Sequence, residues 1–142
     1  MRRLIPGLLL VSVLVTGFAA CSSNDTITTP TTPTTPGNSV TEPPFTGTLK
    51  VNGAATYPFT AATAGTITAT LATVAPDASV GIGLSLGTWN GAACQVVIAN
   101  DNATQTVAIT GAVTAASSLC VRVYDPGRLT APIDFNVTIV HP

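Results

Sequence analysis

The sequence predicts an all-β fold, a two-layer antiparallel β-sandwich with a jelly-roll-like arrangement, and three observations lead to this. Charged residues make up only 8% of the 142 residues, far below the roughly 25% typical of soluble globular proteins. Thr, Val, Ile and Ala are abundant instead, and β-branched residues favour strands. Short segments of alternating apolar and polar residues recur from residue 45 onward, and turn residues separate them.

The first 20 residues have the layout of a signal peptide. Arg2 and Arg3 form a short positive region, an apolar run covers residues 4–18, and the small residues Ala19 and Ala20 follow. The apolar run is shorter than the roughly 20 residues needed to span a bilayer, so a permanent helical anchor is the weaker interpretation. We therefore expect residues 1–20 to direct export.

The segment Phe18-Ala19-Ala20-Cys21 resembles the bacterial lipobox, in which an apolar residue and two small residues precede a lipidated cysteine. The resemblance implies cleavage before Cys21 and attachment of fatty acyl chains such as palmitate to it, so that membrane lipid becomes a partner of the chain. Phe18 departs from the leucine usual in the family. Ser22 stands where the family places an aspartate for inner-membrane retention, which implies an outer-membrane address in the cell envelope. The alternative is ordinary secretion with Cys21 incidental.

Residues 21–44 are predicted to form a disordered linker that carries the lipid at its first residue. Thr-Thr-Pro occurs three times between residues 28 and 36, and Pro43 and Pro44 close the segment. Proline fixes φ and removes backbone donors, so neither helix nor sheet is expected there. A polyproline-II conformation would extend residues 24–44 to about 60 Å. The segment is interpreted either as an O-glycosylated stalk or as a passive linker.

Residues 45–142 are predicted to form the sandwich from eight short strands. Apolar residues alternate with polar ones in several of them, as in the row Leu119, Val121 and Val123, which indicates one buried and one wet face. The predicted strands span residues 45–52, 56–61, 66–74, 80–86, 94–99, 104–112, 118–124 and 133–140.

Turn residues separate these predicted strands. Asn90-Gly91 is the pair favoured in a two-residue hairpin loop, because both positions tolerate positive φ. Asn-Asp-Asn at 100–102 and Asp-Pro-Gly at 125–127 are further turn predictions.

If Cys21 carries lipid, Cys94 and Cys120 remain as a pair in an oxidising compartment, and we expect them to form a disulfide. Cys120 lies on the face opposite Leu119 and Val121, which predicts a bridge on the outer surface of the sandwich. No metal site is expected from the cysteines, since His141 is the only histidine.

Catalysis is not expected. His141 stands next to the C-terminus, where we expect an exposed or strand-end residue, and no Gly-x-Ser-x-Gly segment is present. No cofactor is predicted, and no basic stretch exists to bind nucleic acid. The segment 100–102 and Asp125 offer oxygen atoms that calcium could use, but they lack the dense acidic spacing of calcium loops, and Asx turns explain them equally.

Trp89, Asp101 and Asp125 are the candidate ligand-binding residues, since each lies in or beside a predicted turn. Trp89 is interpreted either as a stacking platform at the rim of the sandwich or as a plug that closes one end of the core. We expect a glycan, a peptide or a partner protein as the ligand.

The domain is similar to the bacterial pre-peptidase C-terminal domains, which are small β-sandwiches found beside secreted proteases. The similarity lies in Tyr57-Pro58-Phe59-Thr60, in the strand from Ala64-Gly65-Thr66 to Leu71, in residues 80–86 and in the segment from Leu119 to Tyr124. It implies a β-sandwich, while the acidic positions that could supply calcium ligands have no counterpart here.

Taken together, these observations predict a membrane-tethered bacterial lipoprotein that displays a non-catalytic binding or accessory module. A structural envelope protein that contacts other envelope components is the alternative.

The tether gives a first prediction. Cys21→Ser should convert the protein from a detergent-phase form into an uncleaved or soluble one, because only the thiol can accept the diacylglyceryl group. Detergent phase separation of cell extracts measures this. Unchanged partitioning of the variant would refute lipidation at Cys21.

Overall fold

The computed structural model describes residues 38–142 and contains nine strands. No helix within these residues is long and apolar enough to cross a bilayer. Cys21 and the predicted signal peptide lie outside the described residues. The strands are β1 (Val40–Thr41), β2 (Phe45–Leu49), β3 (Ala54–Ala61), β4 (Gly65–Ala75), β5 (Ile82–Trp89), β6 (Cys94–Ala103), β7 (Ala108–Val113), β8 (Ser117–Tyr124) and β9 (Ile133–His141).

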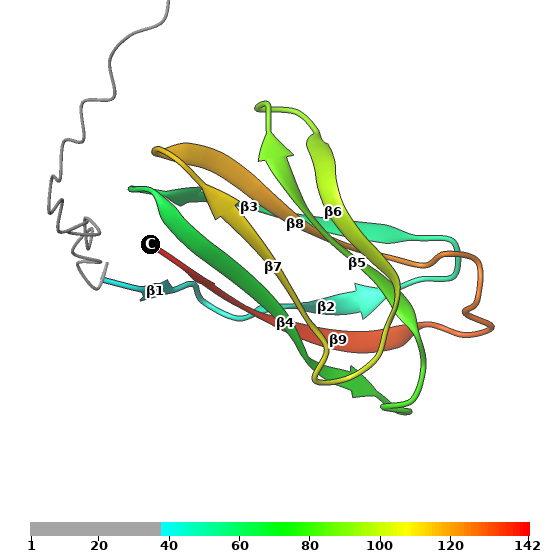
Figure 1. The fold of residues 1–142 in the computed structure, drawn as a ribbon. Helices are drawn as coiled ribbons and strands as arrows, with labels where there is room; N and C mark the ends of the chain where they lie inside the picture. Colours follow the sequence, from blue (N-terminus) through cyan, green and yellow to red (C-terminus); the bar gives the residue numbers. More distant parts are fainter. Residues whose placement is uncertain (1–37) are drawn as a thin grey trace, which may run out of the picture. The chain divides into compact units, whose positions relative to one another are not determined.

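The strands form two antiparallel sheets packed face to face, which confirms the predicted β-sandwich (Figure 1). One sheet has the order β1-β9-β4-β7, with β2 also pairing with β9, and the other has the order β3-β8-β5-β6. The antiparallel pairs β5–β6, β4–β7, β3–β8 and β2–β9 are nested within one another along the chain. This nesting is a long hairpin rolled into a barrel-like sandwich, the jelly roll that we predicted.

The core consists of the apolar residues that alternate along the strands. Leu71 of β4, Leu84 of β5, Val121 of β8 and Val137 of β9 are each fully buried between the sheets. In β9 every second side chain is buried, and the apolar residues that alternate in the other three strands also face the core, so the alternation in the sequence predicts these inward faces correctly.

Strand β1 was not predicted, because residues 40–44 were assigned to the linker. Val40 and Thr41 pair with His141 and Val140 at the end of β9. The next residue, Glu42, lies with its Oε1 2.9 Å from Nε2 of His141. Of the two predicted alternatives for His141, an exposed or a strand-end residue, the structure shows the second: His141 ends β9 and is only 4% exposed.

Two turn predictions also need correction. Residues 100–102 lie inside β6 and not in a turn, because a β-bulge opposite Ile82 and Leu84 takes up the extra residue. The hairpin at Asn90-Gly91 exists, but its loop has the four residues between Trp89 and Cys94.

The predicted strand 104–112 is shorter in the structure, where it becomes β7. The segment from Thr104 to Val107 is a turn in which Val107 N–H donates to Thr104 C=O at 3.1 Å and Thr106 has a φ of 72°. A β-branched residue at positive φ is unusual, so this turn had no signal in the sequence.

Before Trp89, the outer face of β5 carries three small residues, Gly83, Ser85 and Gly87, and all three are buried. At Gly87 a Cβ atom would lie 2.1 Å from the carbonyl oxygen of Gln95. The backbone of β6 therefore occupies the space that a side chain on β5 would need. This face is not the wet face that the alternation predicted.

The disulfide between Cys94 and Cys120 confirms the predicted pairing and its place on the outer face of the sheet. The two Cα atoms are 5.7 Å apart, although β5 lies between β6 and β8 in the sheet and alternate strands are normally about 9.5 Å apart. The start of β6 is thus drawn across β5 toward β8. With a sequence separation of 26 residues, the bond should stabilise the fold by about 3–4 kcal/mol in the chain-entropy model.

This close approach gives a second prediction. Gly87→Ala should lower the free energy of unfolding by about 3 kcal/mol, because backbone atoms of β6 cannot yield as a side chain would. Gly47→Ala is the control, since its Cβ would meet only the ring of Phe135, at 3.3 Å. Chemical denaturation measures both, and equal losses would contradict the steric argument.

Candidate ligand-binding pocket on the outer sheet face

A pocket lies on the outer face of the four-stranded sheet, beside the β5–β6 hairpin. Its volume is about 370 Å³, within the range of small-ligand sites. Its lining combines an indole ring, a hydroxyl group and a guanidinium with small hairpin residues. The lining residues are Thr56, Trp89, Ala92, Ala93, Cys94 and Arg122.

The hairpin forms one wall of this pocket. Trp89 points to the outer face because it continues the row of Gly83, Ser85 and Gly87 on β5. The side-chain oxygen of Asn90 accepts hydrogen bonds from the backbone N–H groups of Ala92 and Ala93, at 3.0 and 2.8 Å, and so fixes the loop. The disulfide at Cys94 then holds the loop over the sheet.

Arg122 lines the pocket from strand β8. It is directly paired with Thr56 of β3 on one side and with Ser85 of β5 on the other. Its guanidinium carbon lies 5.0 Å from the centre of the Tyr124 ring, in the geometry of a cation–π contact. The side chain is half-buried, so the fixed sheet positions and the ring together orient it.

The guanidinium of Arg122 has no acidic partner among the described residues, where the only ion pair joins His141 and Glu42. All five carboxylates of the described residues are engaged elsewhere. Glu42 contacts Tyr57 and His141, Asp77 accepts from Ser79, and Asp101 accepts from Tyr124. Asp125 accepts from backbone N–H groups, and Asp134 accepts from Thr48.

Asp101 belongs to a different cluster, near the start of β5. The Tyr124 ring covers Gly83, and its hydroxyl donates a hydrogen bond to the carboxylate of Asp101. Burial and this hydrogen bond raise the pKa of Tyr124, so the phenol stays a donor. Arg128 donates to the carbonyl oxygen of Asp101 at 3.0 Å and to the side-chain oxygen of Asn102. The cluster ties β6, β8 and the loop after β8 together.

Asp125 organises the turn that follows β8. One of its carboxylate oxygens accepts from the backbone N–H groups of Gly127, Arg128 and Leu129, and the other accepts from that of Asn52. Burial alone would raise the pKa of Asp125, but these backbone hydrogen bonds outweigh it and lower the pKa below its ordinary value. The predicted turn at 125–127 and its Asx role fit this arrangement.

The structure separates the three candidate ligand-binding residues. Trp89 lines the pocket, whereas Asp101 and Asp125 lie toward the opposite end of β5, about 20 Å away at the rise of a strand. Arg122 was not among the candidates. The signal that could have found it is its place on the outward row of 118–124, since Arg122 and Lys50 are the only two cations in the predicted strands.

Within residues 38–142, no group of three or more His, Cys, Asp or Glu side chains could hold a metal ion. Asp101 and Asp125 offered oxygen atoms for calcium in the sequence; in the structure these oxygens accept the hydrogen bonds described above.

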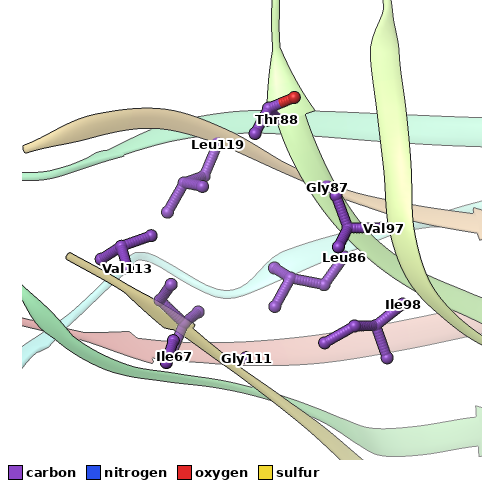
Figure 2. Close-up of a pocket in the computed structure, with 10 residues that line it drawn as sticks. Ile67, Leu86, Gly87, Thr88, Val97, Ile98, Gly111, Val113 and Leu119 are labelled. Carbon is purple, nitrogen blue, oxygen red and sulfur yellow. The ribbon is translucent and has the colours of Figure 1, made fainter. Parts of the chain in front are cut away.

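A second, smaller pocket of about 90 Å³ opens where β7 and β6 form the edges of their sheets (Figure 2). Ile67, Leu86 and Val113 are among the apolar side chains around it. It offers no charged group that would orient a ligand, so we assign it to imperfect packing between two edge strands.

No protein-family model matches this chain, and no curated protein matches it. The similarity to pre-peptidase C-terminal domains and to the lipobox thus stays a prediction from the residues that carry it.

The turn at Asp125 gives a third prediction. Asp125→Ala should lower the free energy of unfolding by about 1–2 kcal/mol, because several N–H groups lose their acceptor. Asp125→Asn should lower the free energy of unfolding less than Asp125→Ala does. Its difference from wild type should be greatest near pH 7. Since the folded pKa lies below the unfolded value of about 4, the advantage of the wild-type aspartate is lost as pH falls through the folded pKa. Urea denaturation between pH 2.5 and 7 measures this. A difference between wild type and Asp125→Asn that does not change with pH would exclude the charge effect.

Proposed function

We propose that this chain is a lipid-tethered lipoprotein of the bacterial cell envelope, whose β-sandwich binds a glycan, peptide or protein without catalysis. The observation that carries the binding role is the pocket at the β5–β6 hairpin. It offers an indole ring at Trp89, a hydroxyl at Thr56 and a guanidinium at Arg122. These groups bind and orient ligands, and an aromatic ring beside few convergent polar groups is the usual composition of a binding site.

The tether part of the proposal rests on the sequence before the domain. Arg2 and Arg3, the apolar run and the lipobox-like segment ending at Cys21 support export and lipidation. Several acyl chains on one residue would hold the protein firmly, since each buried methylene is worth about 0.8 kcal/mol. Ser22 supports an outer-membrane address. The Thr/Pro repeats would then place the domain at a distance from the bilayer.

The alternative is a structural envelope protein, and one observation favours it. Val96 and Val97 are 47% and 71% exposed on β6, which is an edge strand of its sheet. Exposed apolar residues on a strand edge are suited to pairing with another chain. A variant Val97→Thr would weaken envelope contacts under this alternative and leave pocket binding unchanged.

The binding role gives a fourth prediction. Trp89→Ala should weaken ligand binding by at least about tenfold, because aromatic anchors contribute most of the energy at such sites. Glycan arrays and pull-downs from envelope extracts, both with the detergent-solubilised full chain, measure this, and Trp89→Phe should retain part of the binding. Co-purification of envelope partners that survives Trp89→Ala would favour the structural alternative.

A further inference from the structure

We infer that the hairpin pocket recognises a saccharide that bears a carboxylate, with Arg122 binding the carboxylate group. The inference deepens the proposed function and rests on it, because it concerns the ligand class of the same pocket.

The first argument is that Arg122 has no ion-pair partner within residues 38–142. The guanidinium is half-buried and has no acid beside it, while every carboxylate of residues 38–142 is hydrogen-bonded elsewhere. A partly desolvated cation is costly unless an anion or hydrogen-bond acceptor complements it. Within this part of the chain nothing supplies that anion, so the natural complement comes from a ligand.

The second argument is geometry. A guanidinium is a planar fork of N–H donors that matches a carboxylate through two parallel hydrogen bonds. Here the fork is presented from a fixed position in the middle of a sheet, between Thr56 and Ser85, with one face of the group on the Tyr124 ring. This preorganisation lowers the entropy cost of binding.

The third argument is the surface around the cation. Trp89 supplies an aromatic ring, and Thr56 supplies a hydroxyl that both donates and accepts hydrogen bonds. A sugar ring has an apolar face that suits an indole and hydroxyl groups that suit threonine. A uronic acid unites an apolar ring face, several hydroxyl groups and a carboxylate in one small ligand, whereas a peptide terminus has the carboxylate without a ring that carries several hydroxyl groups.

The fourth argument is that the domain has no excess of positive charge that would attract anions nonspecifically. Lys50, Arg122 and Arg128 are the only basic side chains of residues 38–142 besides His141, and five carboxylates outnumber them. A surface of this composition does not attract anions in general. Selective binding of an acidic ligand would therefore report the pocket itself.

The test is a saccharide array that presents uronate-containing oligosaccharides beside the same molecules with their carboxylates methyl-esterified. The detergent-solubilised wild-type chain should bind acidic members at least about tenfold more tightly than their esters, as expected for loss of a charge-assisted pair. This comparison changes only the ligand, so it does not depend on the folding of any variant.

Variants then assign the effect to one side chain. Arg122→Gln should remove the preference for acidic over esterified saccharides, and Arg122→Lys should keep only part of it because the bidentate fork is lost. Lys50→Gln is the matched control, since it removes the same charge at an exposed position outside the pocket. Thermal unfolding checks that all three variants remain folded.

The outcomes separate the two proposals. Equal binding of acidic and esterified members, or a preference that survives Arg122→Gln, overturns the acidic-ligand inference and leaves a binding module for neutral glycans. Absence of any glycan binding also overturns it. If Trp89-dependent capture of envelope components is absent as well, the proposed binding function fails with it.

Discussion

The β5–β6 hairpin is bent across the outer face of its own sheet, and the rest of the outer surface depends on this crossing. The backbone of β6 passes so close to Gly87 that no side chain fits there, and the disulfide from Cys94 to Cys120 holds the two strands in this position. The hairpin is the innermost antiparallel pair of the jelly roll, so the bend lies at the point where the chain turns back on itself. One wall of the candidate pocket is a direct result of this bend.

The few charged side chains of the domain are mostly paired with other groups of the described residues. The domain has few ionisable groups, and four of its five side-chain carboxylates join segments that are distant in sequence, such as Asp125 with Asn52 and Glu42 with His141. Asp77 is the exception, since it bonds Ser79 within its own turn. Arg122 is the half-buried charge that this network leaves without an acid. In a domain with few charges, an arginine without an acidic partner is a stronger indication of a binding site than it would be on an ordinary charged surface.

The strand faces could be predicted from the sequence because they depend on alternation within one segment, as in β8 and β9. Strand β1 could not, because Val40 and Thr41 become a strand only by pairing with β9, about 100 residues later. Residues 100–102 have turn composition, yet pairing with β5 holds them in a bulge. At the site, Trp89 was predictable as a lone aromatic residue beside a turn. The position of Arg122 on an outward row was visible in the sequence, but its lack of an acidic partner was not, since that depends on where the distant carboxylates find their partners.

The place where the chain enters the sandwich has a mechanical consequence. Tension transmitted through the residues before Val40 would load the pairing of β1 with the last residues of β9 first, and then the contact between Glu42 and His141. These bonds lie at the margin of the five-stranded sheet, while the pocket lies on the opposite layer. A pull on the N-terminal side would thus first separate two residues of β1 from β9, before force reaches the sheet that carries the candidate pocket.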